Sequence, residues 1–337
     1  MSFRIAINGY GRIGRCVLRA LYERGFRESL SIAAVNDIAD NRTMAYLTEY
    51  DTTHGRFPGS VCLHGEHLAV NGDRIRLFSE TAIADLPWSE LGIDAVLECS
   101  GAFSSRHHAE AHLQAGAAKV LFSQPADPDV DATIVYGVNH STLKKTHHIV
   151  SNASCTTNCL IPVLKVIDDA FGIRSGVITT IHSAMNDQPV IDAYHHTDLR
   201  RTRCSSQSII PVDTQLARGI GRVLPHLDGR FEATAVRVPT INVSAMDMVL
   251  HVESGTDANA VNDELRAASE TWLHGVLGFS DGPLVSWDFN HDSRSSIVDG
   301  TQTRVSGGSV VKIFAWFDNE WAYAVRMLDT ACALLAC

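Results

Sequence analysis

The segment over residues 151–159, with the sequence SNASCTTNC, places a cysteine where a helix is predicted to begin. Apolar residues follow at helical spacing, and Gly172 then ends the pattern as a C-terminal cap would: Leu160, Val163, Leu164, Ile167 and Phe171. We interpret Ser154 as the N-cap. A thiol at a helix N-terminus lies at the positive end of the helix dipole, which lowers its pKa. We therefore predict that Cys155 is a nucleophile and that nearby backbone N–H groups can hold an oxyanion.

The alternative is that Cys155 is a small apolar residue of the core, as most intracellular cysteines are. Serine, threonine and asparagine neighbours argue against a core position for Cys155, whereas Cys159, one turn later, fits one. The remaining cysteines lack metal-ligand spacing. His108 and His112 lie four residues apart without a suitably placed acid, so we predict no metal site and expect these histidines to be solvated.

The N-terminal segment has the pattern of a dinucleotide site. An apolar strand is predicted over residues 3–8, and a helix follows a G-x-G-x-x-G turn made of Gly9, Tyr10, Gly11, Arg12, Ile13 and Gly14. Asp37 ends a second predicted strand (31–35) and follows Gly14 by roughly 20 residues, where an acid binds the ribose and favours NAD. The alternative for Asp37 is a helix cap in a loop.

Further strands are predicted over 95–99, 120–123, 133–136 and 149–151, alternating with helical patterns such as 107–115. Alternation of this kind is typical of a Rossmann-type doubly wound parallel sheet, so the fold class is α/β. Strand ends line the cofactor crevice in such sheets. The residues after two of these strands are therefore candidates for contact with the dinucleotide: Ser100, Gly101, Ser123, Gln124 and Pro125.

After residue 172 the strands become longer and β-branched, over 176–181, 234–238, 244–252 and 310–316. This predicts a second, α+β catalytic domain with a mostly antiparallel sheet. A polar and basic loop is expected over 194–210, and its arginines belong either to a solvated surface or to an anion site. A closing helix over 320–335 is predicted to pack on the first domain. We expect an NAD-binding domain of residues 1–154 with 319–337 and a catalytic domain of residues 155–318.

Composition limits the possible partners. The 337 residues carry 28 Lys and Arg against 38 Asp and Glu, a net charge of −10, which argues against nucleic acid as the main partner. The N-terminal segment lacks the pattern of a signal peptide, and membrane-length apolar runs are missing from the sequence. We expect a cytoplasmic protein that does not bind membranes.

A dinucleotide site, an activated Cys155 and a histidine at a strand end, His182, together suggest covalent oxidation of an aldehyde. The thiolate adds to the aldehyde, hydride passes to the nicotinamide, and a second nucleophile cleaves the resulting thioester. His182 would accept a proton, although a lone histidine is more often structural. Arg201 and Arg237 are candidates to bind phosphate, since guanidinium groups match its geometry.

These residues also carry a resemblance, because the chain is similar from end to end to the glyceraldehyde-3-phosphate dehydrogenase family. The motifs are INGYGRIG, ASCTTNC at 153–159, TTIHS at 179–183, DLRR at 198–201, RVPT at 237–240 and WFDNEW at 316–321. The resemblance implies NAD as cofactor, a homotetramer, a phosphorylated aldehyde as substrate, Cys155 as nucleophile and His182 as its acid/base partner. It further implies that Asn319 holds the nicotinamide amide and that Arg201 and Arg237 bind phosphate; we expect Ser154, Thr156 and Thr214 to contact the substrate.

Departures from the phosphorylating members gather at the expected anion sites. Met185 replaces a threonine, Asp213 and Gln215 stand where the family has small residues, and the usual lysine near Ser123 is missing, with Asp127 in that neighbourhood. Lost donors and added carboxylates weaken phosphate binding. These departures are similar to the family's branch that oxidises erythrose 4-phosphate, in which water cleaves the thioester. The alternatives are a phosphorylating glycolytic enzyme and, in another class, a non-catalytic NAD- or redox-sensing protein.

Overall fold

The computed structural model describes residues 2–195 and 198–337, and the chain divides into two compact units. The first unit comprises Met1–Ser154 and Tyr323–Cys337, and the second comprises Cys155–Ala322.

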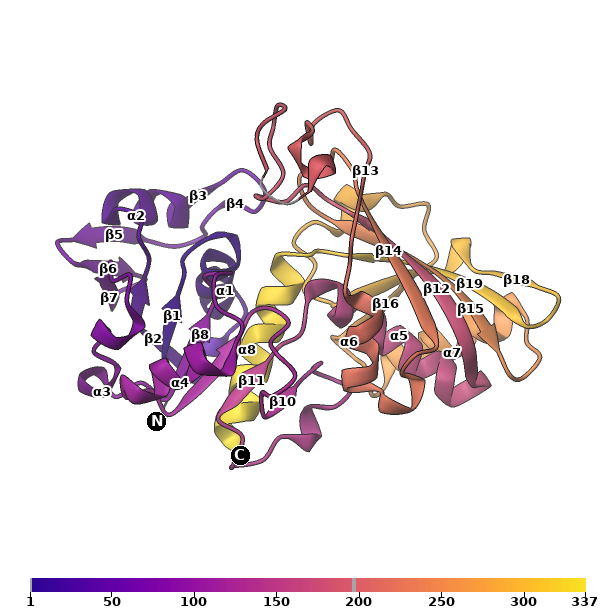
Figure 1. The fold of residues 1–337 in the computed structure, drawn as a ribbon, viewed down its shortest axis with the longest axis horizontal. Coiled ribbons are helices and arrows are strands. Elements are labelled where there is room, and N and C mark those ends of the chain that lie inside the picture. Colours follow the sequence, from indigo (N-terminus) through magenta and orange to yellow (C-terminus); the bar gives the residue numbers. More distant parts are fainter. Residues whose placement is uncertain (1, 196–197) are drawn as a thin grey trace. The chain divides into compact units, whose positions relative to one another are not determined.

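The first unit is built on a nine-stranded sheet in the order β10-β11-β9-β8-β1-β2-β7-β6-β5 (Figure 1). Its strands are β1 (Phe3–Asn8), β2 (Leu30–Asn36), β5 (Val61–His64), β6 (His67–Val70), β7 (Asp73–Phe78), β8 (Ala95–Glu98), β9 (Lys119–Phe122), β10 (Ala132–Thr133) and β11 (Ile149–Ser151). All neighbouring pairs are parallel except β5–β6 and β6–β7. The predicted doubly wound parallel sheet is confirmed, and it carries an antiparallel edge that was not predicted.

Helices cover both faces of this sheet. Side chains alternate along a strand, so Ala6 and Val96 point to the face that Trp88 of α3 (Trp88–Leu91) covers. On the same face α4 (Arg106–Gln114) packs through Ala109. Gly14 of α1 (Arg12–Glu23) packs against Ile7 on the opposite face. The remaining elements of the unit are α2 (Asn41–Glu49), β3 (Tyr50–Asp51), β4 (Gly55–Arg56), η1 (Phe26–Glu28), η2 (Ile83–Asp85) and η3 (His140–Thr142).

The closing helix α8 (Trp321–Ala336) returns to the first unit, as the sequence predicts. The Tyr323 hydroxyl donates to the carbonyl of Ala153 at 2.8 Å, and Thr330 Oγ1 donates to Asn152 Oδ1 at 2.7 Å. Lys119 Nζ donates to the carbonyl of Leu334, also at 2.8 Å. These bonds attach the closing helix to the segment that follows β11 and to the start of β9.

The strand order places a switch point between β1 and β8. From β1 the chain continues to β2 on one side, and from β8 it continues to β9 on the other. Ligands of open α/β sheets bind at the carboxyl ends of the strands at such a point. The residues that follow β1 and β8, Gly9 and Cys99, therefore occupy the expected binding edge.

The second unit contains an eight-stranded sheet in the order β13-β14-β12-β15-β19-β17-β16, with β18 paired to β19. Five of its pairs are antiparallel and two are parallel, as predicted for the catalytic domain. The strands are β12 (Ile173–His182), β13 (Ile210–Val212), β14 (Phe231–Arg237), β15 (Ser244–Val252), β16 (Leu277–Ser280), β17 (Ser296–Asp299), β18 (Arg304–Ser306) and β19 (Val310–Phe317).

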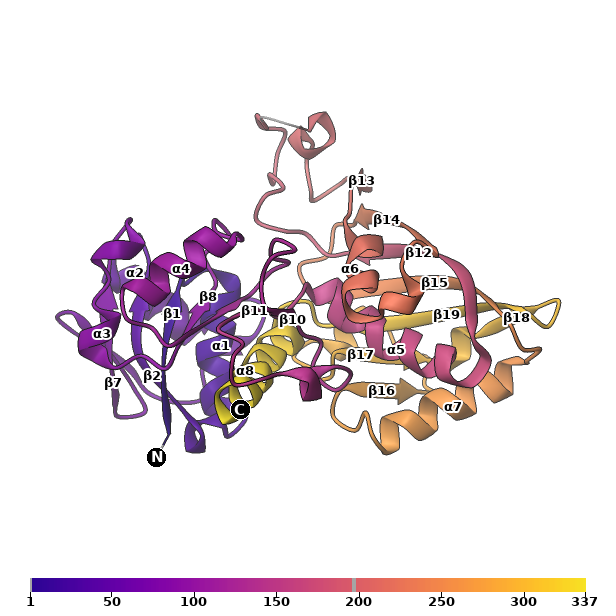
Figure 2. The same cartoon turned by 60° about the horizontal axis from the view of Figure 1, so that its bottom comes forward.

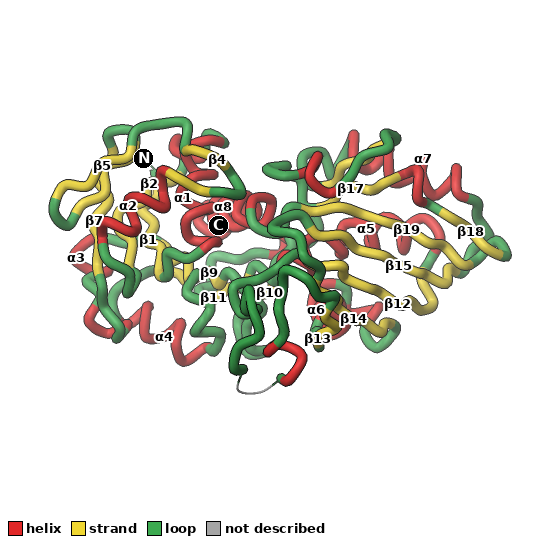
Figure 3. Tube along the Cα trace, turned by 90° about the horizontal axis from the view of Figure 1, so that it is seen from above, coloured by secondary structure: helices red, strands yellow, loops and turns green. Residues whose placement is uncertain are grey.

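Three helices, α5 (Cys155–Phe171), α6 (Leu216–Val223) and α7 (Ala258–Glu270), lie on one face of this sheet, as Figures 2 and 3 show. Gly172 has φ +66°, which is the left-handed cap predicted for the end of α5. The unit also contains η4 (Leu199–Thr202), η5 (Pro225–Leu227), η6 (Ser286–Phe289) and η7 (Gly300–Gln302). The expected loop over 194–210 therefore includes a short 3₁₀ turn, apart from His196 and Thr197, which lie outside the described residues.

One predicted strand is wrong in extent. Residues 133–136 were expected to form a strand, but β10 ends at Thr133. Ile134 and Val135 are fully buried, yet the backbone N–H of Val135 donates to the side chain of Asn139 at 2.8 Å instead of to a strand. The run of buried apolar residues thus extends beyond the residues that are hydrogen-bonded as a strand. Within the part of the chain that the structure describes, the helices are too short or too polar to cross a bilayer.

Candidate active site

The turn between β1 and α1 brings three backbone segments into close contact. Gly9 has φ +89°, and a Cβ atom there would lie 2.3 Å from the backbone N and Cα of Ser100. A Cβ atom on Gly14 would lie 2.2 Å from the carbonyl oxygen of Gly9. Both positions therefore require glycine. The turn leaves room beside the N-terminus of α1, where backbone N–H groups can bind a pyrophosphate.

Asp37 lies beside this turn. Its carboxylate accepts hydrogen bonds from the backbone N–H of Tyr10 and, at 2.9 Å, from that of Ala39. The side chain of Tyr10 instead points into the core, where its hydroxyl contacts Thr48 Oγ1 at 2.8 Å and burial raises its pKa. Arg12 at the start of α1 forms an ion pair with Asp51. Although burial alone would raise the pKa of Asp51, hydrogen bonds from Arg12 and the His54 backbone lower it to about 2.

Beneath the turn lies a buried polar network centred on Glu98, at the end of β8. Asn8 Nδ2 donates to Glu98 Oε2 at 2.6 Å, and the backbone N–H of Ser100 donates to Oε1 at 2.9 Å. His112 Nε2 lies 3.0 Å from Glu98 Oε2, and Trp88 Nε1 donates to His112 Nδ1 at 3.0 Å. An indole N–H can only donate, so Nδ1 accepts and Nε2 carries the proton.

This network corrects the expectation that His112 is solvated, because its side chain is completely buried. His108, by contrast, is partly exposed and contacts Ser105 Oγ at 2.7 Å. The spacing of the two histidines carried no information on the partners of His112, which come from α3 and β8. The role of His112 in the fold is to hold the carboxylate that supports Asn8 and Ser100.

The crevice at this edge fits a dinucleotide. It has a volume of about 440 Å³ and is lined by residues from the ends of β1, β2 and β8, including Gly9, Gly11, Asp37 and Ser100. Ser123, at the end of β9, donates its backbone N–H to the carbonyl of Glu98 at 2.9 Å. Sequence reasoning missed most of the other lining residues, among them Glu80, Thr81 and Phe103. No local motif marks them, because tertiary contacts bring them to the crevice.

In the second unit, Cys155 is the first residue of α5 and His182 is the last residue of β12. Cys155 Sγ lies 3.7 Å from His182 Nε2. His182 Nδ1 lies 2.9 Å from the backbone carbonyl oxygen of Ser183, an atom that can only accept. Nδ1 therefore carries the proton, and Nε2 presents its lone pair to the sulfur. The structure thus brings the predicted nucleophile and base together with the base in the competent tautomer.

The prediction that the position of Cys155 lowers its pKa is wrong for the chain without ligand. Burial raises the pKa of the thiol to about 12, and the backbone N–H groups of Thr156 and Cys155 offset only part of this shift. Burial also lowers the pKa of His182, and the nearby Arg237 adds to this effect. Both shifts disfavour the charged forms, so a neutral thiol beside a neutral imidazole is favoured over an ion pair.

Arg237 belongs to the same site, because it pairs with His182 across β12 and β14. Its buried guanidinium contacts Asp187 Oδ1 at 2.8 Å and donates to Gln188 Oε1 at 3.0 Å. Arg201 Nη1 also donates to Asp187, at 3.1 Å. The two arginines predicted to bind phosphate thus meet at one carboxylate. Sequence reasoning assigned Asp187 no role, because its pairing with Arg201 and Arg237 joins separate segments of the chain.

The other predicted substrate contacts are less closely grouped. Ser154 directly precedes α5, and Thr156 is its second residue; both are partly exposed. Thr214 accepts a hydrogen bond from the backbone N–H of Leu216 at 3.2 Å, at the start of α6. A Cβ atom on Gly219 of α6 would lie 3.2 Å from Thr157 Oγ1, so α6 packs against the first turn of α5. Asp213 and Gln215 are exposed.

Asn319 follows β19 and is nearly buried, with an exposed fraction of 8%. Its Oδ1 accepts hydrogen bonds from the hydroxyls of Ser183 and Ser244, both at 2.9 Å. The ring of Phe317, at the end of β19, meets His182 edge to face with 6.2 Å between ring centroids. Asn319 and His182 therefore lie at the same edge of the sheet, after the ends of β19 and β12, with the start of β15 between them. The two serines were not identified from the sequence as site residues.

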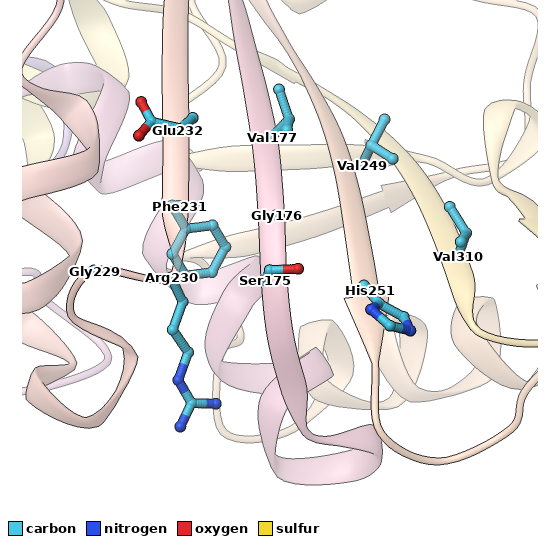
Figure 4. A pocket seen from close by; sticks show the side chains of 10 residues that line it. All are labelled: Ser175, Gly176, Val177, Gly229, Arg230, Phe231, Glu232, Val249, His251 and Val310. Carbon is cyan, nitrogen blue, oxygen red and sulfur yellow. The ribbon is translucent and has the colours of Figure 1, made fainter.

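A second hollow of this unit lies on the helix-free face of the eight-stranded sheet (Figure 4). It is a shallow groove of about 380 Å³ across β12, β14, β15 and β19, from which Val177, Val249 and Val310 project. These valines have exposed fractions of 56%, 40% and 40%. Its lining includes none of the predicted site residues.

Comparison with protein families gives two matches that together span most of the chain. Residues 3–106 match the NAD binding domain of glyceraldehyde 3-phosphate dehydrogenase. Residues 154–319 match the C-terminal domain of glyceraldehyde 3-phosphate dehydrogenase. The first match contains the Gly9 turn and Asp37, and the second contains Cys155, His182, Arg237 and Asn319.

Proposed function

The chain belongs to the glyceraldehyde-3-phosphate dehydrogenase family of NAD-dependent aldehyde oxidoreductases, and we propose that it oxidises D-erythrose 4-phosphate to 4-phosphoerythronate. The product is a precursor in pyridoxal 5′-phosphate biosynthesis. The observation that carries the proposed chemistry is the 3.7 Å contact between Cys155 Sγ and an imidazole nitrogen that holds no proton. We propose that NAD occupies the crevice lined by Gly9, Gly11 and Asp37. Tyr10, Arg12, Ile13, Gly14 and Ser123 remain predicted cofactor contacts outside that lining, and the family resemblance implies that Asn319 binds the nicotinamide amide.

In the proposed reaction, Cys155 Sγ attacks the aldehyde carbon while its proton passes to His182 Nε2. The backbone N–H groups of Cys155 and Thr156 face the sulfur and are in position for an oxyanion on the adjacent carbon. NAD, when bound, supplies the acceptor for the hydrogen and two electrons that the substrate carbon loses. The protein is left with a thioester on Cys155. Water then forms the new C–O bond, the C–S bond breaks, and the sulfur recovers a proton.

The choice of substrate rests on the residues around Arg237. Met185 Sδ lies 3.6 Å from Arg237 Nη2, at a position where the phosphorylating members carry a threonine hydroxyl. A thioether cannot donate a hydrogen bond to phosphate, and Asp187 already occupies part of each arginine's hydrogen-bonding capacity. The thioether of Met185 disfavours a second, inorganic phosphate beside the substrate and supports cleavage by water. A phosphorylating enzyme that tolerates Met185 is the alternative.

A non-catalytic redox-sensing role is a weaker alternative, because it gives no reason for the fixed tautomer of His182. We also propose that the protein is a homotetramer. The helix-free sheet face, with its three exposed valines on neighbouring strands, supports contact with a second copy (Figure 4).

The covalent step can be tested by intact-mass measurement on protein mixed with NAD and erythrose 4-phosphate and quenched in acid before the thioester is hydrolysed. We expect the native protein to gain the mass of the acyl group and Cys155→Ala to gain none while still binding NAD. Cys159→Ala is a matched control, because Cys159 is a buried cysteine one turn along the same helix. It should form the adduct as the native chain does. An adduct or turnover in Cys155→Ala would remove the proposed mechanism.

A further inference from the structure

Two buried serine hydroxyls converge on the amide oxygen of Asn319. Ser183 and Ser244 have exposed fractions of 0% and 1%, and each hydroxyl lies 2.9 Å from Asn319 Oδ1. The backbone N–H of Ser183 also donates to Ser244 Oγ at 3.0 Å. That bond occupies Ser244 Oγ as an acceptor and leaves its hydrogen for Asn319. The amide oxygen therefore receives two hydrogen bonds from side chains that cannot exchange them with water.

This arrangement fixes which end of the amide is available. If the amide were rotated by half a turn, Nδ2 would face the two hydroxyls, and both hydroxyl hydrogens would lose Oδ1 as their acceptor. Ser244 would keep only a long contact, 3.5 Å, with Ser183 Oγ, and the Ser183 hydrogen would be left unpaired. Leaving buried donors unpaired is costly. The orientation with Oδ1 toward the serines is therefore favoured. Nδ2 is the end left for an incoming group, and among the described residues it has no hydrogen-bond partner.

Sheet register accounts for the meeting of these groups. Ser244 begins β15 and pairs with Phe317 of β19, two residues before Asn319. Ser183 directly follows β12, which pairs with β15 on the other side. The backbone carbonyl oxygen of Ser183 also accepts a hydrogen bond from Nδ1–H of His182, with 2.9 Å between the oxygen and Nδ1. One residue thus orients the base through its backbone and Asn319 through its side chain.

We propose that Ser183 and Ser244 are positioning residues that hold Asn319 with Nδ2 as a donor toward the carbonyl oxygen of the nicotinamide carboxamide. The inference rests on the proposed role of Asn319 in binding the nicotinamide. Neither serine touches the cofactor in this account. Their effect is to remove the alternative orientation, in which the amide oxygen would face the carboxamide oxygen and repel it.

The test is a mutant cycle on the full chain, with the dissociation constant of NAD measured by isothermal titration calorimetry. We expect Ser244→Ala to weaken NAD binding about 2- to 10-fold, the range that corresponds to one hydrogen bond, and the Ser183→Ala/Ser244→Ala variant to weaken it further. Asn319→Ala should weaken it at least as much as the double variant. In the Asn319→Ala background, the serine substitutions should change the NAD dissociation constant less than twofold.

Two controls separate positioning from general damage. Ser296→Ala removes an equally buried hydroxyl of the same sheet, 3.5 Å from Cys159 Sγ, and should leave NAD binding unchanged. The rate of Cys155 alkylation by iodoacetamide should stay within twofold in the serine variants, because the carbonyl that orients His182 is retained. If the double variant does not fold, Ser244→Ala alone and its combination with Asn319→Ala complete the cycle.

The outcomes distinguish this inference from the proposed function. If Asn319→Ala leaves NAD binding unchanged, the proposed role of Asn319 fails, and the positioning role fails with it. If Asn319→Ala weakens binding but the serine variants do not, the positioning role is overturned and the role of Asn319 stands. The positioning role would also be overturned if Ser244→Ala weakened NAD binding as much in the Asn319→Ala background as in the native chain.

Discussion

Replacing Gly9 by alanine tests the close approach of backbones on which the dinucleotide crevice depends. The new Cβ atom would lie 2.3 Å from Ser100 N and Cα and 2.6 Å from the carbonyl carbon of Cys99. All three are backbone atoms, so no flexible side chain can move aside. The turn after β1 would have to separate from the end of β8. That movement strains the bonds from Cys99 N to Asn8 O at 2.6 Å and from Gly9 N to Asn36 O at 2.8 Å.

The expected loss in the free energy of unfolding of Gly9→Ala has two parts. A residue with a Cβ atom at positive φ costs about 1–2 kcal/mol, and overpacking of a tight contact adds about 1–3 kcal/mol. Gly25→Ala is a matched control, since Gly25 has φ +78° but no atom within 4 Å of an added Cβ. We expect Gly25→Ala to show only the first part. The difference between the two variants therefore isolates the backbone contact.

The assay is urea denaturation of both variants, together with calorimetric titration of NAD. We expect Gly9→Ala to lower the free energy of unfolding by about 2–5 kcal/mol, to exceed Gly25→Ala by at least about 1 kcal/mol, and to abolish measurable NAD binding. Gly25→Ala should bind NAD normally. Equal destabilisation by the two substitutions, or unaltered NAD binding by Gly9→Ala, would refute the reasoning about this turn.

Three further predictions concern the buried histidines and the arginine site. His112→Ala removes the partner that Trp88 Nε1 and Glu98 share, and it should lower the free energy of unfolding, measured by urea denaturation, by about 2–4 kcal/mol. The control is His107→Ala, at an exposed position, which should lower it by less than about 0.5 kcal/mol. Burial lowers the pKa of His182, so as the pH falls below 6.5 the unfolded chain gains a proton on this histidine while the folded chain does not. The folded state should therefore lose stability, and the urea concentration at the unfolding midpoint should be lower at pH 5.5 than at pH 7.5. This decrease should be smaller in His182→Asn. Lysine cannot reproduce the contacts of Arg237 with Asp187 and Gln188, so Arg237→Lys should raise the KM for the sugar phosphate roughly tenfold or more with a smaller change in kcat; an unchanged KM would count against a phosphate site there.

Local sequence patterns were sufficient to predict those helices, strands and turns that are specified by residues close together in the sequence. The apolar run of β1, the glycines after it and the apolar stripe of α5 each specify their structure through nearest neighbours along the chain. The edge strands β5 and β6 were missed because each has only four residues, too few for a clear strand pattern; β5 is largely exposed, whereas β6 alternates buried and half-buried residues. The strand at β10 was predicted to extend too far because the buried apolar residues Ile134 and Val135 have the sequence pattern of a strand although they lie outside it.

Properties that depend on distant segments were not predictable in the same way. The partners of His112 come from β8 and α3, and nothing in its own helix indicates them. The pKa of Cys155 was predicted from the helix N-terminus alone, but burial by other elements has the larger effect and acts in the opposite direction. The meeting of Arg201 and Arg237 at Asp187 likewise requires the tertiary fold.

The central claim concerns the substrate and the nucleophile that releases it. It is tested most directly by measuring NADH formation with erythrose 4-phosphate and with glyceraldehyde 3-phosphate, each with and without inorganic phosphate. We predict a higher kcat/KM for the four-carbon sugar and a rate that does not depend on phosphate. Strict dependence on phosphate together with preference for the three-carbon sugar would contradict the account and identify the chain as a phosphorylating member of the family.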